Sequence, residues 1–141
     1  MRVEASQEIA RPVAEVFRFF AREHIRNHPR WDPDIALEAT SDAPLAVGSI
    51  IRRRNSRSGT PVEGTMEVVE FDADRAFATV IREGPVEVRG GAIFDPIGAD
   101  RTKLTITSDM PDDPRWNPSL IKSRMQRSVE AIKDLIEAEP H

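Results

Sequence analysis

Residues 117–138, NPSLIKSRMQRSVEAIKDLIEA, predict the element around which the rest of this chain is arranged. Asn117 is a typical N-cap residue, and Pro118 suits the first helical turn, where a backbone N–H is not needed. One face of the predicted helix covers about a third of the helical wheel and is formed by Ile121, Met125, Ser128, Val129, Ile132, Leu135 and Ile136. The opposite side is mostly charged, so we expect a long amphipathic helix with one buried face.

Strand patterns fill most of the chain before this helix. Residues 2–9 alternate with period two, with Val3, Ala5, Gln7 and Ile9 on one face. From residue 34 to residue 110, short alternating segments separated by turns predict about six successive antiparallel strands. Gly64 and the pair Gly90–Gly91 lie inside these segments, where glycine is typical of bulges or strong bends. A bent sheet needs something to wrap around, and the C-terminal helix supplies it.

A short helical segment follows the first strand. Pro12 suits the first position of a helix, and one apolar stripe follows at helical spacing, formed by Val13, Val16, Phe17, Phe20 and Ala21. We expect the helical segment to end by His28, because a residue before proline avoids the α region. The order of strand, short helices, antiparallel strands and long helix predicts an α+β fold with the helices on one face of the sheet.

Length and composition indicate one ordinary globular domain, residues 1–141. Hydrophobic residues make up 39% and charged residues 31%, no run approaches a membrane span, and the first ten residues lack an apolar signal region. The absence of cysteine excludes disulfides, thiolate metal sites and a cysteine nucleophile. A net charge of −4 argues against nucleic-acid binding. Since the chain lacks cysteine and an apolar signal region, we expect a cytoplasmic location.

Five segments in order along the chain resemble a known superfamily. They are IARPVAEVFRFFA at 9–21, HPRWDPDI at 28–35, VGSII at 47–51, VVEFDADRAF at 68–77 and FDPIGADRTKLTI at 94–106. These segments, followed by the final amphipathic helix, are similar to the START-like (SRPBCC) helix-grip proteins. That group includes the Bet v 1 allergens and the polyketide cyclase/dehydrase and lipid-transport family. The resemblance implies a helix-grip fold, in which a curved antiparallel β-sheet wraps around a long C-terminal α-helix, with two short helices after strand 1. It also implies an internal cavity for a small hydrophobic molecule, without cofactor or metal.

Trp31 lies between two prolines in the stretch 27–35, NHPRWDPDI. In the proteins that this chain resembles, the tryptophan after the short helices packs where they meet the open end of the sheet. Pro29 would then end the helix, and Pro33 would precede the second strand. Trp31 either anchors the core there or stacks on a ligand.

The candidate ligand-binding residues are the side chains that strand alternation and helix faces turn inward. From the sheet and the long helix they are Met66, Val68, Phe77, Thr79, Val88, Ala92, Phe94, Leu104, Ile106, Met125, Val129 and Ile132. Phe20, His24 and Trp31 join them from the segment after the first strand, and Gln7 is a polar exception able to orient a ligand, as is Ser108. The alternative is that these residues fill the core and leave no pocket.

No arrangement typical of catalysis or of a metal site is evident in the sequence. His24 and His28 have i, i+4 spacing, but no third ligand follows and Pro29 argues against helix at His28, so we expect a histidine near the cavity mouth. Arg52 and Arg54 share one strand face, where they either hold a ligand carboxylate or cover a solvated edge, and we favour the edge. Trp116, before the long helix, is a gate, an interface residue or a cover for the helix start.

Three functions are compatible with these patterns. The leading hypothesis is non-covalent binding or transport of a small hydrophobic or amphipathic molecule in an internal cavity. The second is an enzyme resembling polyketide cyclases or dehydratases, which requires at least two inward polar side chains that converge in the pocket. The third is a cochaperone- or antitoxin-like interaction module, which predicts a filled core and an exposed apolar patch. Homodimerisation through an exposed strand is a further hypothesis.

Overall fold

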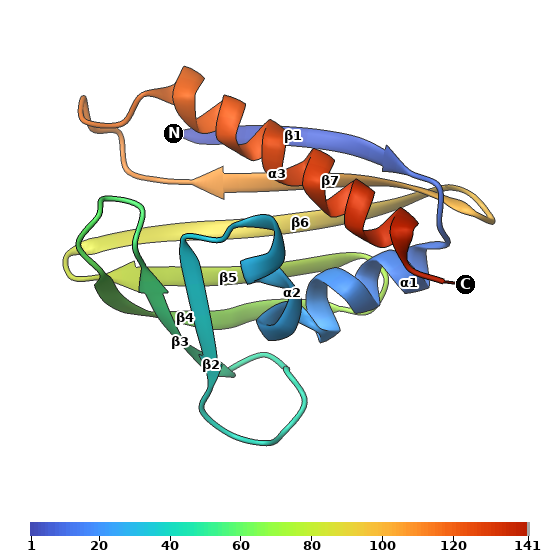
Figure 1. Ribbon diagram of the computed structural model, residues 1–141, viewed down its shortest axis with the longest axis horizontal. Helices are drawn as coiled ribbons and strands as arrows, with labels where there is room; N and C mark the ends of the chain where they lie inside the picture. Colours follow the sequence, from blue (N-terminus) through green and yellow to red (C-terminus); the bar gives the residue numbers. More distant parts are fainter. Residues whose placement is uncertain (141) are drawn as a thin grey trace.

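The computed structural model describes residues 1–140, and in these residues an antiparallel seven-stranded sheet carries the helices on one face (Figure 1). The strands are β1 (Arg2–Ile9), β2 (Ile35–Ala39), β3 (Ile50–Asn55), β4 (Val62–Asp72), β5 (Ala76–Glu83), β6 (Val86–Gly98) and β7 (Arg101–Asp109). Their order across the sheet is β1-β7-β6-β5-β4-β3-β2. Strands β2 to β7 therefore form the predicted meander, and β1 pairs with β7, so the first and last strands are neighbours at one edge of the sheet.

The long helix α3 (Pro118–Ala138) has the predicted start and the predicted buried face. The Asn117 side chain accepts hydrogen bonds from the backbone N–H groups of Ser119 (3.0 Å) and Leu120 (3.2 Å), which satisfies two donors of the first turn. Val129, Ile132 and Ile136 are buried against the sheet. The helix-grip prediction is confirmed, because α3 lies across the sheet that curves around it (Figure 1).

The predicted short helices are α1 (Val13–Phe17) and α2 (His24–Trp31), joined by a π-helical turn, η1 (Arg18–Arg22). The prediction that helical structure ends by His28 is wrong, because α2 contains Pro29 and continues to Trp31. The N–H of Asp32 donates to the carbonyl of His28 at 3.0 Å, so the last turn closes beyond the proline. The Trp31 ring packs on Phe20 and His28, and this packing outweighs the local preference of a residue before proline.

The bulges of the sheet lie at positions other than those that the glycines suggested. Its pairing shifts register between Val68 and Glu70 on β4 and between Pro96 and Gly98 on β6. Gly64 has a different role, since a Cβ there would overlap the carbonyl oxygen of Arg82 on the neighbouring strand. Glycine is therefore needed at residue 64 for close approach of β4 and β5 rather than for a bulge.

An apolar core fills the space between the sheet and the helices α1 and α3. Phe17 is fully buried there, with the Phe71 and Phe94 rings edge-on to it at centroid distances of 5.3 and 5.1 Å. The Glu137 carboxylate accepts a hydrogen bond from the backbone N–H of Ala10 at 2.8 Å, which ties the end of α3 to the connection after β1. None of the helices in residues 1–140 is long and apolar enough to cross a membrane.

Candidate functional site

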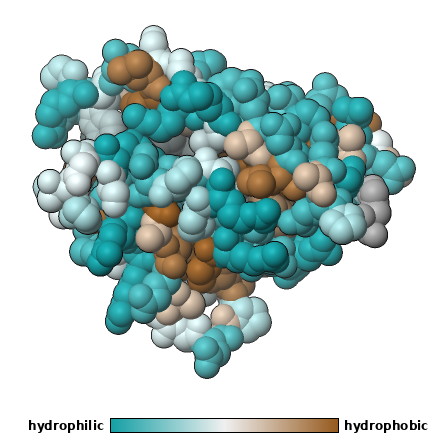
Figure 2. Space-filling view, in the orientation of Figure 1, coloured by the Kyte–Doolittle hydropathy of each residue, from teal (hydrophilic) through white to brown (hydrophobic). Residues whose placement is uncertain are grey.

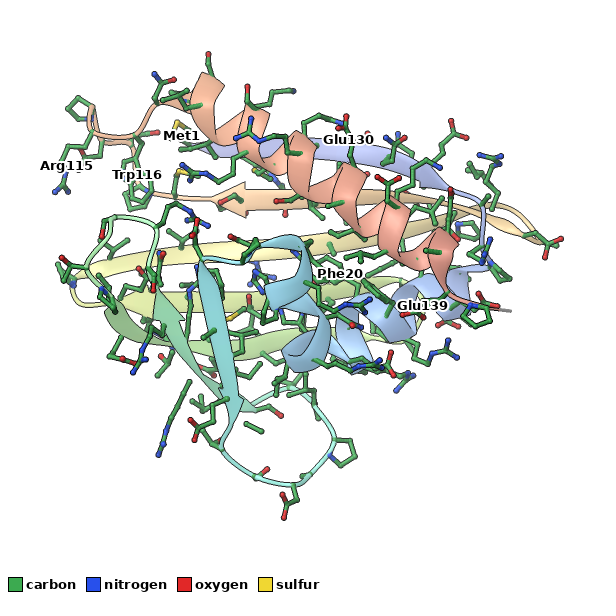
Figure 3. The ribbon with its side chains drawn as sticks, viewed as in Figure 1. Met1, Phe20, Arg115, Trp116, Glu130 and Glu139 are labelled. Atoms are coloured by element: carbon green, nitrogen blue, oxygen red, sulfur yellow. The ribbon has the colours of Figure 1, made fainter. Side chains whose placement is uncertain are left out.

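A cavity with a volume of about 290 Å³ lies between the sheet, α2 and the N-terminal half of α3. Side chains from all three regions form its wall, among them Trp31 from α2, Ile81 from β5 and Met125 from α3. Trp116 also lines it, from the connection between β7 and α3, whereas Phe20 lines it from η1, well away from Trp116 (Figure 3). The face shown in Figure 2 is mostly hydrophilic, and its largest apolar area lies around α2 and β2.

Ten of the sixteen candidate ligand-binding residues line this cavity, namely Phe20, His24, Trp31, Met66, Phe77, Thr79, Val88, Ile106, Met125 and Ile132. The other six lie outside its wall, namely Gln7, Val68, Ala92, Phe94, Leu104 and Val129. Five of these six are buried in the apolar core. Gln7 lies on β1 opposite Leu104 and is half-buried, and its side-chain oxygen accepts a hydrogen bond from the backbone N–H of Glu8 at 3.1 Å. Ser108, the second polar residue that the sequence analysis considered able to orient a ligand, lies in the cavity wall.

Trp31 belongs to an aromatic cluster at the α2 side of the cavity. Its ring stacks on Phe20, with centroids 5.2 Å apart and planes at 15°, and on His28, with centroids 5.1 Å apart and planes at 11°. These contacts hold the ring in place and agree with the core-anchor hypothesis. Trp31 is nevertheless half-buried and contributes to the cavity wall, so the same ring is available to a ligand.

His24 and His28 form a hydrogen-bonded pair on α2. His24 Nδ1 lies 2.7 Å from the carbonyl oxygen of Phe20, and His28 Nδ1 lies 2.9 Å from His24 Nε2. Burial lowers the pKa of His24 to about 4, with a smaller contribution from the positive charge of Arg53. Burial, His24, Arg53 and Arg57 together lower the pKa of His28 well below its usual value. Both imidazoles are therefore neutral near pH 7.

Arg53 is a buried cation of the cavity wall, and the sequence did not single it out. Its Nε donates to Glu83 Oε1 at 3.0 Å, and one terminal nitrogen contacts the Met66 sulfur at 3.7 Å. Asn55 also donates to the Glu83 carboxylate, at 3.3 and 3.4 Å. Burial lowers the pKa of Arg53, and the Glu83 carboxylate counteracts part of this effect. The ion pair is therefore largely shielded from water, with side-chain exposures of 7% and 17%.

The neighbouring arginines of β3 point away from the cavity. Arg52 and Arg54 are exposed and pair with Glu38 at 3.4 Å and Glu63 at 2.7 Å. Their solvated position agrees with the favoured prediction, but β3 is not an edge strand, because β2 pairs with its outer side. Ile51, rather than Ile50, faces the core.

A second ion pair and a third arginine lie at the cavity wall close to α2 and α3. Arg57 donates to Asp32 Oδ2 at 2.6 Å, and both side chains are partly shielded. Arg124 on α3 lines the same cavity, and burial and the charge of Arg57 lower its pKa. Sequence patterns carried no signal for these three residues, because they come from a turn, a helix cap and the charged side of α3.

The polar residues of the cavity do not form a metal site. In the described part of the chain, no group of three or more histidine, cysteine, aspartate or glutamate side chains is placed to hold a metal ion. His24 Nε2, which a metal shared with His28 would require, is occupied by the hydrogen bond between the two rings.

Solved structures share this architecture over nearly the whole chain. A START superfamily protein from Mycobacterium smegmatis matches with a TM-score of 0.75 and 15% identity, over 96% of this chain and 97% of that chain. Ara h 8.0201 matches with a TM-score of 0.72 and 15% identity, over 99% of each chain. The di-domain ARO/CYC BexL from the BE-7585A biosynthetic pathway matches with a TM-score of 0.73 and 22% identity, over 97% of this chain and 46% of that chain. At these identities the similarity shows the fold alone.

Sequence comparison shows the family. No curated protein matches this chain. The family model described as polyketide cyclase / dehydrase and lipid transport matches residues 1–137. This match over nearly the whole chain shows that the chain belongs to the polyketide cyclase / dehydrase and lipid transport family.

Proposed function

We propose that the protein binds one small amphipathic molecule non-covalently in the cavity beneath the N-terminal half of α3. The observation that carries this proposal is the division of the cavity wall into an apolar part and a polar part. The apolar part includes Met66, Phe77, Ile81, Val88, Ile106 and Met125. The polar part holds His28 and the Arg53–Glu83 pair. An apolar wall with a few polar groups is typical of small-molecule sites.

The size of the cavity supports a small ligand. A volume of about 290 Å³ lies near the lower end of the roughly 300–1,000 Å³ of known ligand pockets. Met66 and Met125 contribute flexible side chains to the wall, which suits ligands of irregular shape. We therefore expect a molecule of one to three rings or a short branched chain rather than a full-length lipid.

A second candidate function is an enzyme of the cyclase or dehydratase type. The specific observation that favours it is the convergence of inward polar side chains, since His28, Arg53 and Glu83 all line one cavity. A neutral histidine beside a cation is able to remove a proton and to stabilise the negative charge that develops. The interaction-module hypothesis required a filled core, and the open cavity argues against it.

The test is native mass spectrometry of the purified protein, together with titration of a fluorescent apolar probe. We expect an adduct of near-stoichiometric mass that is lost on denaturation, or saturable binding of the probe when the cavity is empty. Gly90→Leu should abolish both, because a Cβ at Gly90 would meet Thr79 Oγ1 at 3.7 Å and the remaining side chain would extend into the cavity.

Asp95→Leu is the matched control, because residue 95 lies on the same strand with its side chain exposed and away from the cavity. This variant should bind as the unmodified protein does. Equal binding by Gly90→Leu and the unmodified protein would show that the probe does not occupy this cavity, and no adduct and no probe binding in any preparation would count against the proposed function.

A further inference from the structure

The two histidines of α2 form a hydrogen-bond chain with a fixed direction. The Phe20 carbonyl oxygen can only accept a hydrogen bond, so His24 carries its proton on Nδ1. A neutral imidazole has one N–H, so His24 Nε2 is an acceptor and His28 Nδ1 donates to it. The proton of His28 is therefore also on Nδ1, and the lone pair of His28 is on Nε2.

The lone pair of His28 has no partner within the described protein. The hydrogen bonds of this ring within residues 1–140 involve Nδ1 alone. Among the same residues, every side-chain nitrogen or oxygen that is shielded from solvent has a hydrogen-bond partner. His28 Nε2 is thus accessible, and His28 belongs to the cavity wall. The cavity contains an acceptor whose partner must come from water or from a bound molecule.

The surroundings keep this acceptor neutral and hold its ring in place. The ring stacks on Trp31 with planes at 11°, and the His24 ring lies 5.1 Å from the Phe77 ring. Arg53 and Arg57 disfavour a positive charge on His28, while their partners Glu83 and Asp32 are each engaged in an ion pair. The cavity therefore presents a neutral acceptor close to a buried guanidinium.

We infer that His28 Nε2 is the binding site for a weakly acidic hydroxyl group, of the phenol or enol type, on the bound molecule, and that His24 is a positioning residue that fixes the tautomer of His28. A hydroxyl suits this place because it donates to the lone pair, while its oxygen keeps the partial negative charge that Arg53 favours. A carboxylate does not suit it, since an ionised carboxylate has no proton to donate to Nε2. This inference rests on the proposed function.

The first test is nitrogen NMR of the unmodified protein, which contains three histidines. Without ligand, His24 and His28 should both show a protonated Nδ1 and an unprotonated Nε2 at pH 7. Addition of 2-naphthol should move the Nε2 resonance of His28 upfield, as expected when a lone pair accepts a hydrogen bond. Addition of 2-methoxynaphthalene, which has no hydroxyl proton, should leave this resonance in place. An Nε2–H tautomer on His28, or the same response to both compounds, would overturn the inference.

The second test compares affinities for the same two compounds. The unmodified protein should bind 2-naphthol about tenfold more tightly than 2-methoxynaphthalene, because one hydrogen bond distinguishes the two. His28→Phe keeps a ring against Trp31 and removes the acceptor. It should lose the preference for 2-naphthol and retain the affinity for 2-methoxynaphthalene.

The outcomes separate this inference from the proposed function. Binding of both compounds with equal affinity to the unmodified protein would overturn the hydroxyl site and leave the proposed cavity ligand standing. Binding of neither compound would count against both. A His28→Phe variant that does not fold would leave the NMR comparison, which needs no substitution, to decide.

Discussion

The two halves of α3 cover regions with opposite properties. In the C-terminal half, Val129 and Ile136 are buried in the apolar core. In the N-terminal half, Ile121 and Met125 are only half-buried and form one wall of the cavity. Ile132, fully buried but also in the cavity wall, marks the boundary. One amphipathic face thus stabilises the fold at one end and encloses a candidate site at the other.

The chemistry of the opposing sheet explains this difference. In the apolar core to which this half belongs, the Phe17 and Phe94 rings pack edge to face with centroids 5.1 Å apart. Under the N-terminal half, the sheet and α2 present the Arg53–Glu83 pair and the two histidines. Buried charged groups need ion-pair partners and hydrogen bonds, so they constrain which side chains can surround them. The cavity wall therefore combines polar groups with aromatic rings, whereas the core around Phe17 is apolar.

The sharpest test of this comparison changes the same residue type at both ends of α3. Ile136→Ala should lower the free energy of unfolding by about 3 kcal/mol, since it removes a side chain that is 3% exposed from a close-packed core. Ile121→Ala should lower it by about 1 kcal/mol or less, because Ile121 is half-buried at the cavity wall. The helix-propensity change is the same at both positions, so urea denaturation reports the packing difference directly. Equal losses would show that the two halves are packed alike.

A second test compares two arginines that are adjacent in β3. Glu83→Gln leaves the buried Arg53 without its counter-ion and should cost about 2–3 kcal/mol of stability. Glu63→Gln removes the partner of Arg54, but both of these side chains are more than half exposed. Its expected cost is below about 1 kcal/mol, because water screens the pair.

Salt separates these two pairs further. The small effect of Glu63→Gln should vanish in 1 M salt, whereas that of Glu83→Gln should persist. A loss of stability in Glu83→Gln that salt abolishes would contradict the shielded position of the Arg53–Glu83 pair.

Alternation along the strands predicted which side chains face the long helix, but not where space remains beneath it. Val88 and Phe94 lie on the same face of β6, six residues apart, which is roughly 20 Å along a strand. Val88 lines the cavity, whereas Phe94 is buried in the core. Phe94 packs on the Phe17 and Phe20 rings of α1 and η1, and such tertiary packing is not encoded in any single strand.

The inward arginine was missed for a related reason. Ile50 and Ile51 begin the two faces of β3, so the pattern of this strand alone fits either orientation, and a change of one residue exchanges all its side chains between the faces. Pairing of Ile51 with Met66 on β4 decides the orientation and turns Arg53 inward. The histidine pair was set aside as a metal site because no third ligand follows and because Pro29 argued against helix at His28, although the packing of Trp31 keeps α2 helical beyond that proline.

The smallest of the three expected stability effects depends on pH and comes from His24 in the cavity wall. The pKa of His24 is about 4 in the folded protein and 6.5 in its ordinary state, so the unfolded chain binds the proton more readily between these values. Stability should therefore fall as the pH falls from 6.5 to 4, with a loss of about 2 kcal/mol between pH 7 and pH 5 from His24 alone. The lowered pKa of His28 acts in the same direction.

Urea denaturation at several pH values measures this loss, and His24→Gln provides the control. The variant replaces a titrating group that is hydrogen-bonded to the Phe20 carbonyl and to the His28 ring. The positive charge of Arg53 also acts on this group. Its stability should depend less steeply on pH over the same interval, because one fewer proton is taken up on unfolding. An unchanged slope would mean that His24 is not held neutral in the folded state. The region under the N-terminal half of α3 would then differ from the core in packing but not in the pH dependence of its stability.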